Sequence, residues 1–486
     1  MGSLALDASS TASDNTAVGY DAAGAITTGD LNVAIGKGAM GSNTVGDRNV
    51  AIGANALYSY NPGSNEDGYN TAIGFEALKT VTTGQQLVAV GRQALALNTT
   101  GSQNTACGYA ALYSNTTGGS NTAAGYSALY SVTTGDNNTG FGRDTLYFTT
   151  TGSDNTAIGN EALENNTANY NTAVGSHALT ANTTGLYNTA IGAEALETTT
   201  TSNNMVAIGF RAMEANTTGS SNTAVGGFCL DANTTGYYNA AFGTDAMGAN
   251  TTGDQNTALG TFALGGNTTA NDNTAVGFKA LHSTTTGGGN VAVGASAGEE
   301  GTALTTGVAN TLIGRHTKVS SASANQQFVV GNSLTAFGDS SFNIGSDASG
   351  RVYNLFGQNA TWTRTSDERS KKDITTNTDC GLNFINDLRT VTYKWKAPSE
   401  TPETFTSYNA SITEPVYKEK LYGFIAQEVK QALDKNNITD FTGWSEADDG
   451  SQGISYEMFI MPLVKAVQEL SAENTALKDR LDAAGL

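Results

Sequence analysis

The chain has 486 residues, of which 58 are Gly and only 5 are Pro, and its formal net charge is −20. This acidity disfavours nucleic acid as a partner, because Lys and Arg side chains supply most of the affinity for phosphates. Abundant Gly, with frequent Asn, Thr and Ala, is also unusual for a globular protein of this length and indicates an internal repeat. Residues 1–314 carry 7 basic and 22 acidic side chains, whereas residues 315–486 carry 17 and 22, so the composition changes near residue 315.

Neither a membrane span nor a cysteine-based site is expected. No segment approaches the roughly 20 consecutive apolar residues that a spanning helix needs, and residues 1–14 lack the pattern of an export signal. Cys107, Cys229 and Cys380 are too few and too widely separated for a disulfide framework or a CxxC metal site. We therefore expect reduced thiols, no membrane insertion, no cofactor, no metal and assembly in a cytoplasm.

A short motif of the form Asn-Thr-Ala-Val/Ile-Gly recurs eighteen times, nearly always seventeen residues apart. Most copies continue into Ala-Leu at the eighth and ninth positions and close with Asn-Thr-Thr-Gly. Self-similarity of this kind predicts a solenoid of stacked coils over residues 15–314. The motif begins at residues 15, 32, 49, 70, 87, 104, 121, 138, 155, 171, 188, 205, 222, 239, 256, 273, 290 and 310.

Each repeat contains two short apolar segments, one with Val or Ile at the fourth position and one with Ala-Leu, separated by turn residues. We expect both segments to be strands with buried aliphatic side chains. Burying two such side chains contributes about 3 to 6 kcal/mol, whereas ordering seventeen backbones costs about 17 to 34 kcal/mol. A single repeat therefore cannot fold, and stability is expected from stacking, from ladders of Asn and Thr, and from three chains sharing a core.

Substitutions within the repeat give further expectations. Cys107 takes the fourth position and Cys229 the eighth, so both are predicted to be small apolar core residues. His177 and His282 occupy different positions, so no metal-binding column is expected.

The extra residues between positions 49 and 70 and between 290 and 310 predict surface loops. We favour inert loops over receptor contacts. The segments Asn49-Val-Ala-Ile-Gly53 and Asn290-Val-Ala-Val-Gly294 resemble the repeats in heads of trimeric autotransporter adhesins. That resemblance implies a trimeric β-roll.

After a β-rich neck predicted over residues 315–365, a chemically informative segment begins at Ser366. A Ser followed five residues later by Lys371 can form a nucleophile and general base if the lysine is neutral when it accepts the proton. Burial would lower the lysine pKa, and the neighbouring cations Arg369 and Lys372 would act in the same direction. Taken alone, the pair is weak evidence, because such a charged run more often forms a solvated loop.

The wider pattern is more specific. It comprises Ser-Asp-x-Arg-x-Lys over 366–371, GLNFINDLRTVTYKW over 381–395, YGFIAQEVKQAL over 422–433 and a terminal helix. This pattern resembles the intramolecular chaperone auto-processing domain of phage tailspikes, tail fibres and endosialidases. The resemblance implies that residues 366–486 form a small α+β domain that trimerises and templates folding of the preceding β-structure.

The same resemblance implies that this domain cuts the chain between Thr365 and Ser366. Ser366 would be the nucleophile and Lys371 the general base, with Asp367 and Arg369 organising the loop. Some members keep the fold without cleaving, so single-turnover autoproteolysis remains open.

The terminal segment independently predicts a coiled coil over about residues 456–483. Apolar residues alternate four and three apart, which is the spacing of a heptad seam, and Asn474 is the one polar member that would fix register. A helix packed only against its own domain is the alternative for the first two turns. The seam comprises Tyr456, Ile460, Leu463, Val467, Leu470, Asn474, Leu477 and Leu481.

The sequence thus predicts a mainly β protein, in which a trimeric solenoid of seventeen-residue repeats precedes a chaperone domain ending in a coiled-coil helix. The favoured function is a phage tail fibre or spike located in the virion. Its expected partners are two further copies, other tail proteins and a host surface receptor, either a glycan or a protein.

Two other functions remain open. One is a glycan-degrading tailspike, which needs a carboxylate pair in a groove, whereas the shaft acids recur at repeat positions. The other is a bacterial or environmental adhesin or an ice-binding protein. The Thr pairs lie in turns beside Gly, which argues against the flat Thr array that ice binding needs. The acids are Glu161, Glu164, Glu194, Glu197 and Glu214.

Overall fold

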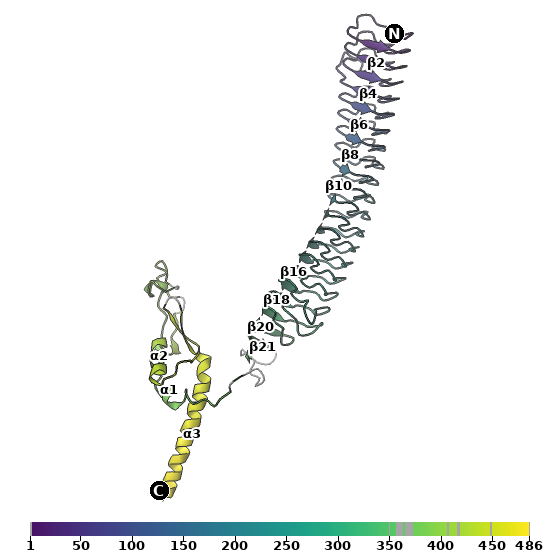
Figure 1. Cartoon of the computed structure of the whole chain (residues 1–486). Helices are drawn as coiled ribbons and strands as arrows, with labels where there is room; N and C mark the ends of the chain where they lie inside the picture. The colour runs from purple at the N-terminus through teal and green to yellow at the C-terminus, as the bar shows by residue number, and fades with distance from the viewer. Residues whose placement is uncertain are drawn as a thin grey trace. The chain divides into compact units, whose positions relative to one another are not determined.

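The computed structural model describes residues 2–348, 350–355, 363–364, 372, 374–405, 408–415, 418–447 and 450–485. The chain divides into two compact units, residues 1–365 and 366–486 (Figure 1). The first is a β-solenoid, and the described part of the second consists of short strands, three α-helices and two 3-10 helices.

Strands β1 to β18 of the solenoid each span three residues and begin at the second position of a predicted repeat. Each pairs in parallel with the next strand in a register of one repeat, as in Thr189 with Val206 and Ala190 with Ala207. This confirms the predicted stack of seventeen-residue coils. The bounds are β1 Thr16–Val18, β2 Val33–Ile35, β3 Val50–Ile52, β4 Thr71–Ile73, β5 Val88–Val90, β6 Thr105–Cys107, β7 Thr122–Ala124, β8 Thr139–Phe141, β9 Thr156–Ile158, β10 Thr172–Val174, β11 Thr189–Ile191, β12 Val206–Ile208, β13 Thr223–Val225, β14 Ala240–Phe242, β15 Thr257–Leu259, β16 Thr274–Val276, β17 Val291–Val293 and β18 Thr311–Ile313.

The parallel stack continues past residue 314, where the sequence predicted a separate neck. Strands β19 (Phe328–Gly331) and β20 (Ser341–Ser346) extend it in parallel. Gln327 takes the place of the usual Asn, and its backbone N–H donates to Asn310 Oδ1 at 3.0 Å. The sheet then reverses, with β21 (Gly350–Leu355) and β22 (Thr363–Arg364) pairing antiparallel.

The two faces of each strand differ in a way that the sequence interpretation missed. Successive side chains of a strand point to opposite sides, and in each coil the third-position residue, almost always Ala, is the buried one. The fourth-position Val or Ile, predicted to be in the core, points outward and is exposed or half-buried. For the same reason Cys107 is exposed, which corrects its predicted core placement, whereas Cys229 is buried as predicted.

The Ala-Leu segment is buried as predicted, but it is a turn rather than a strand. Leu95 and Leu112 are fully buried, yet their φ angles are 52° and 50°, in the left-handed region that Leu rarely adopts. This conformation aims the Leu112 N–H at the Ala128 carbonyl oxygen of the next coil, 2.9 Å away. The hydrogen bond and the burial of the Leu side chain offset the backbone strain.

Glycine at the fifth position ends each strand. Gly192, for example, has a φ of 142°, and a Cβ atom there would lie 2.2 Å from the Gly209 carbonyl oxygen of the next coil. A larger residue would force adjacent coils apart.

Buried carboxamides at the first position connect consecutive coils. The backbone N–H of Asn121 donates to Asn104 Oδ1 at 2.8 Å, and Asn121 Nδ2 donates to the Gly135 carbonyl at 2.8 Å. Asn138 then repeats the contact with Asn121 Oδ1 at 2.9 Å. The predicted Asn ladder is therefore present, and it satisfies polar groups that would otherwise be costly to bury.

The Asn-Thr-Thr-Gly turn carries a second ladder. Asn250 Nδ2 donates to Asn233 Oδ1 at 2.8 Å, and Asn267 Nδ2 donates to Asn250 Oδ1 at 2.7 Å. Beside it, the first Thr of the pair donates its hydroxyl to the next coil, as from Thr234 Oγ1 to the Thr251 carbonyl at 3.0 Å.

The two insertions are surface loops, as predicted. Residues 63–66 in the first and residues 300–302 in the second are exposed. Neither interrupts the strand register, because β3 pairs with β4 and β17 pairs with β18 residue for residue.

The second unit has a small core of its own. Its elements are α1 (Leu382–Asn386), β23 (Val391–Tyr393), the 3-10 helix η2 (Pro398–Glu400), β24 (Leu421–Gly423), α2 (Ala426–Lys435), β25 (Trp444–Glu446), β26 (Gln452–Ile454), the 3-10 helix η3 (Tyr456–Phe459) and α3 (Ile460–Ala483). Strand β23 pairs antiparallel with β24, and β25 pairs antiparallel with β26. The buried core residues are Phe384, Val429, Ala432, Leu433, Ile438 and Phe459.

Replacing Thr199 by Asn is expected to stabilise the solenoid. Thr199 interrupts the second ladder between Asn182 and Asn216, and among the described residues Asn182 Oδ1 has no hydrogen-bond partner. An Asn at 199 supplies a donor to Asn182 and an acceptor to Asn216 Nδ2, a gain of about 1 kcal/mol per chain. The measurement is the guanidinium concentration at which half of the far-UV circular dichroism is lost.

The control for this change is Thr201→Asn, on the exposed part of the same turn, which adds the same side chain without joining the ladder. A midpoint for Thr199→Asn no higher than that of the control contradicts the role assigned to the ladder.

Candidate functional site

The predicted cleavage site lies outside the described residues. Thr365, Ser366, Asp367, Arg369 and Lys371 all fall in the segment 365–371, for which no placement is given. The predicted nucleophile and base therefore remain predictions. What the structure describes is the unit that follows them.

The core of this unit joins its helices through aromatic contacts. Phe384 of α1, Phe441 and Phe459 of η3 meet with ring centroids 5.1 to 6.1 Å apart. Phe424 adds a further ring 5.3 Å from Phe459. Aromatic pairs at these separations stabilise beyond simple area burial, and here they hold α1 against the start of α3, while α2 joins the same core through Val429, Ala432 and Leu433.

Two polar contacts tie the segment after α1 to α2. Arg389 donates to the Glu428 carboxylate from two nitrogens, with Nε 3.0 Å from Oε2. On the same side, the Asp387 carboxylate accepts from Lys435 at 2.6 Å and from Asn436 at 2.8 Å. These partners lower the carboxyl pKa of Glu428 and of Asp387 below their usual values.

Glu469 fastens α1 to α3. Its Oε2 accepts the backbone N–H of Leu382, the first residue of α1, at 2.6 Å. That hydrogen bond, followed by the contact with Lys465, lowers the pKa of the Glu469 carboxyl. Sequence reasoning missed this contact, although Pro462, Ala466 and Glu469 share one helix face at spacings of four and three, about 100° around the helix from the seam.

The predicted seam residues of α3 face away from this packing. Leu463, Val467 and Leu470 are 48%, 64% and 47% exposed, while the buried residues of α3 are Pro462 and Ala466. Tyr456, predicted to start the seam, lies in η3, before α3 begins at Ile460. From Ser471 to Gly485 every residue is exposed, Asn474, Leu477 and Leu481 included.

The second half of α3 has no packing partner among the described residues. Helices in water gain most of their stability from packing an apolar face, and a row of exposed leucines adds the cost of hydrating apolar surface. Among the described residues no helix has the length and apolar character needed to cross a membrane. Apolar residues that alternate four and three apart and are exposed are the pattern that coiled coils bury.

The chain thus belongs to the class of mainly β proteins in which a solenoid of seventeen-residue coils precedes a small C-terminal unit with a long terminal helix. Within that unit, residues 366–438 match the family model described as chaperone of endosialidase. No curated protein and no solved structure gives a significant match. Domains of this family are associated with trimeric assembly, and the combination fits a protein of the tail-fibre or endosialidase type.

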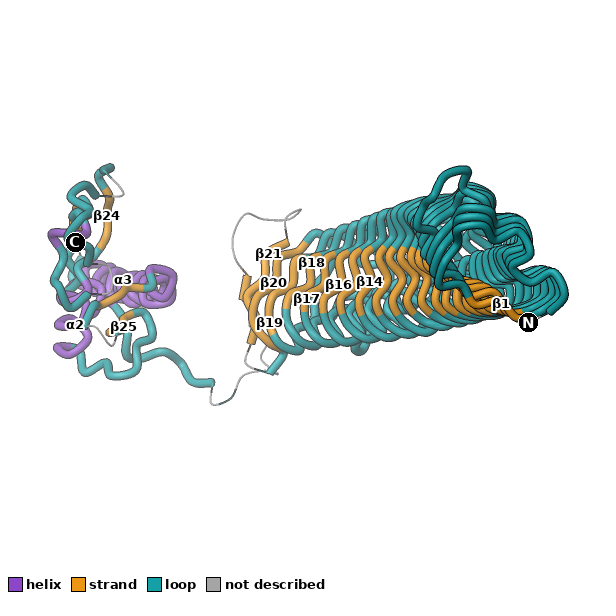
Figure 2. The backbone as a smooth tube through the Cα atoms, turned by 90° about the horizontal axis from the view of Figure 1, so that it is seen from above, coloured by secondary structure: helices purple, strands orange, loops and turns teal. Residues whose placement is uncertain are grey.

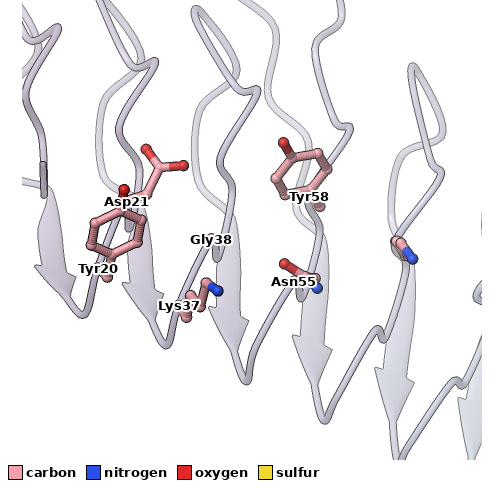
Figure 3. A pocket seen from close by; sticks show the side chains of 7 residues that line it. Tyr20, Asp21, Lys37, Gly38, Asn55 and Tyr58 are labelled. Carbon is pink, nitrogen blue, oxygen red and sulfur yellow. The ribbon is translucent and has the colours of Figure 1, made fainter.

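The first coils of the solenoid form a hollow of about 310 Å³ (Figure 3). Tyr20 and Tyr58 stand on either side of Lys37, with Asp21 and Asn55 nearby. Lys79 also lines the hollow, so Lys37 and Lys79 together are two of the seven basic residues of segment 1–314. Aromatic rings beside amide, carboxylate and ammonium groups suit a polar ligand such as a saccharide.

Three of the predicted shaft acids cluster on two adjacent coils and are half-buried. Carboxylate oxygens of Glu194, Glu197 and Glu214 lie within 4.8 Å of one another. Arg211 offsets their charge, with its Nε 2.5 Å from Glu194 and 3.6 Å from Glu214. None of these residues lines the hollow described above.

The other predicted acids, Glu161 and Glu164, occupy the same repeat positions in an earlier coil. His177 lies 3.5 Å from Glu161, and burial together with Glu161 raises the pKa of Glu164. His282 is in a different setting, with its Nδ1 3.1 Å from the Phe262 carbonyl.

Replacing Glu469 by Gln is expected to loosen α1 from α3 and to reduce the acid sensitivity of the second unit. A carboxyl whose pKa is lowered on folding stabilises the folded state at pH values above its ordinary pKa of 4.5. That stabilisation is lost as the pH falls from 4.5 through the lowered pKa. The third tryptophan of the chain, Trp362, is in the first unit, so a Trp362→Phe background leaves Trp395 and Trp444 of the second unit as the reporters. Tryptophan fluorescence during urea unfolding in that background measures the change. The wild type is expected to lose more stability between pH 7 and pH 3 than the variant.

The matched control is Glu473→Gln, one turn further along α3, where the side chain is exposed. An equal pH dependence in the wild type and Glu469→Gln contradicts the role of the Leu382 contact.

Proposed function

We propose that the chain is one subunit of a homotrimeric phage tail fibre or spike, folded under the direction of its own C-terminal domain and then cut between Thr365 and Ser366. The observation that carries the proposal is the chaperone-of-endosialidase match at residues 366–438, directly after a solenoid of repeats. The fibre assembles in the host cytoplasm and resides in the virion.

A kinetic argument supports the need for such a domain. A stack of identical coils has many wrong registers, and pairing distant segments is slow because loop entropy is lost before contacts form. A parallel coiled coil at one end sets three chains in one register before the shafts fold. The exposed seam of α3, with Asn474 as its polar member, supplies that coiled coil.

The proposed cut follows from the chemistry of the pair. Neutral Lys371 takes the hydroxyl proton of Ser366 as Oγ attacks the Thr365 carbonyl carbon. The amide bond breaks, an ester forms, and the freed amine of Ser366 takes up the proton. Water then hydrolyses the ester, leaving Thr365 as the carboxyl end of the shaft and Ser366 as the amino end of the released domain.

Cleavage after folding would leave the shaft kinetically trapped, because it could not realign its chains once unfolded. The match to the chaperone family begins at Ser366, and the division between the two compact units falls at the same bond. Both observations support Thr365–Ser366 as the point of cleavage.

Receptor contact belongs to the same proposal. The hollow between Tyr20 and Tyr58 offers the shaft a place for a surface saccharide, and other tail proteins complete the assembly. Adsorption of the purified chain to host cells tests this part. Ice binding is disfavoured, because the first Thr of each pair donates its hydroxyl to the neighbouring coil, as at Thr99 and Thr116.

Expression of the full chain is expected to yield two fragments, one ending at Thr365 and one starting at Ser366, because the Ser–Lys pair cuts once per chain. Ser366→Ala is expected to remain whole and Ser370→Ala to be cut as the wild type is. Intact-mass spectrometry under denaturing conditions is the measurement. If the wild-type chain stays uncut but is trimeric, the proposed cleavage is wrong and the proposed chaperone role still stands.

Replacing Leu477 by Asp is expected to abolish the trimer, since three carboxylates would be buried in the seam. Yield of soluble shaft is expected to fall at least tenfold. The control Lys478→Asp introduces the same side chain at the next exposed position, off the seam. Native mass spectrometry distinguishes three copies from one, and a trimer of normal yield from Leu477→Asp refutes the chaperone seam.

A further inference from the structure

The turn that follows each strand carries most of the basic and aromatic side chains of the shaft. Figure 2 shows the strands, in orange, as one band, with the turns, in teal, stacked along the solenoid beside it. Positions six, seven and ten of each coil lie in this turn, and we call their side chains the turn face. It holds twelve of the 21 aromatic residues of segment 1–314 and six of its seven basic residues. These six are Lys37, Lys79, Arg92, Arg143, Arg211 and Lys279.

The charge of the turn face changes along the shaft. In the eight coils that begin at residues 15 to 138 it carries four basic and three acidic side chains, whereas in the next six coils it carries one basic and seven acidic side chains. The second stretch therefore repels an anionic ligand and the first does not. In the first stretch the cations are Lys37, Lys79, Arg92 and Arg143, and the acids are Asp21, Glu76 and Asp144.

In the first stretch, rings and guanidinium groups of consecutive coils lie one over the next. At the sixth position the Arg92 guanidinium lies 5.8 Å from the centre of the Phe75 ring in the preceding coil and 5.7 Å from that of Tyr109 in the following coil. The Tyr109 and Tyr126 rings then stack with their centres 5.0 Å apart. A parallel row at the tenth position stacks at 5.1 Å per coil and consists of Tyr113, Tyr130 and Tyr147.

The sixth-position groups are accessible to a ligand. The rings of this row are 40% to 55% exposed, with Tyr109 at the lower limit and Tyr126 at the upper. Arg143 already pairs with the Asp144 carboxylate at 2.8 Å, whereas Arg92 has no ion pair among the described residues. The two neighbouring rings hold the Arg92 guanidinium in place through cation–π contacts. Arg92 is therefore a positioned cation that can bind an anionic group.

The hollow at Tyr20, Lys37 and Tyr58 is the start of the same surface. Position ten is Gly in the first two coils, which leaves room for the hollow, and Lys79 in its wall belongs to the coil that holds Phe75. Hollow and rows together extend over eight coils, or about 38 Å at about 4.7 Å per coil. A compact ligand would fill the hollow alone, so a surface of this length fits a chain-like ligand that lies along the shaft.

The chemistry of the surface selects among chain-like ligands. Exposed rings can pack against the apolar faces of sugar rings, and the side chains of Asp21, Asn55 and Glu76 can hydrogen-bond to sugar hydroxyls. Guanidinium and ammonium groups such as Arg92 and Lys37 bind carboxylates through charge-assisted hydrogen bonds. A nucleic acid fits less well, because its affinity comes mainly from cations that neutralise many phosphates, and here three carboxylates lie among four cations.

We propose that the turn face of the first eight coils binds a linear polysaccharide that carries carboxylates and lies along the shaft axis. The proposal rests on the proposed contact with a host receptor, and it adds the chemical class of that receptor and the surface that binds it. The hollow holds one part of the polysaccharide, the aromatic rows pack against sugar rings further along, and Arg92 pairs with a carboxylate. The acidic turn face that begins at Glu161 limits the bound length.

The experiment measures binding of the purified full chain to immobilised polygalacturonate, alginate and hyaluronate by surface plasmon resonance. Each polysaccharide has its own methyl ester as reference, which keeps the sugar chain and removes the charge. At least one acidic polysaccharide is expected to bind about tenfold more tightly than its ester, because charge-assisted hydrogen bonds are lost in the ester. Added salt is expected to weaken this binding, since it screens exposed charges.

The variant Arg92→Gln is expected to weaken the binding to the acidic polysaccharide about tenfold. The matched control is Lys279→Gln, which also removes a cation that lies over two rings of the turn face, 5.8 Å from the centre of Phe262 and 5.5 Å from that of Phe278. Lys279 lies outside the first eight coils, so this change is expected to leave the binding as in the wild type.

A loss confined to Arg92→Gln supports the proposed surface. The inference is overturned if both variants lose binding equally, if the esters bind as tightly as the acids, if a single-stranded oligothymidine binds more tightly than every polysaccharide, or if no acidic polysaccharide binds. Native mass spectrometry of the same samples separates this failure from that of the proposed function. Three copies that bind no polysaccharide leave the trimeric fibre standing, whereas single chains contradict the fibre whichever probe they bind.

Discussion

The structure depends on hydrogen bonding between coils in a fixed register. A seventeen-residue coil is too small to fold alone, and each one is completed by groups of its neighbours. Asn104 Oδ1 accepts the backbone N–H of Asn121, and the left-handed turn at Leu112 aims its N–H at Ala128. The stability of the solenoid is therefore a sum of contacts between adjacent coils. If two coils pair in the wrong register, the coils that stack after them are misaligned as well.

That constraint links the two units of the chain. A long stack of coils has one correct register and many wrong ones, so it folds correctly more often when folding starts at a single place. Helix α3 carries the exposed seam that can provide this starting point. The proposed order of assembly follows from this: the helix joins the copies first, and the coils of the shaft stack afterwards in the register it has set.

Much of the fold could be predicted from the sequence. The seventeen-residue spacing of the motif locates the start of all eighteen strands, because turn residues mark every coil. The composition changes near residue 315, whereas the parallel stack continues through β19 and β20. Side-chain size alone predicts the wrong strand residue for the interior. The ninth-position Leu fills most of the space inside each coil, so the strand contributes the small third-position Ala to the interior. Alternation along the strand then forces Val and Ile outward, and Cys107 with them.

Other features have weak sequence signals. Leu in a left-handed turn contradicts its usual preference, so the Ala-Leu pattern favours a strand where the structure has a turn. The contact between Glu469 and Leu382 joins residues far apart in the chain, and only the shared face with Pro462 and Ala466 hints at it. The nucleophile Ser366 and the base Lys371 are identified from motif and resemblance, and they stay predictions.

The account is tested most directly by an experimental map of the shaft, obtained by cryo-electron microscopy of the protein expressed with its C-terminal domain. It predicts three solenoids per particle, each with the third-position Ala and ninth-position Leu inside its coils and the fourth-position Val and Ile outside. A single solenoid per particle, or coils with Val and Ile in the interior, would contradict it.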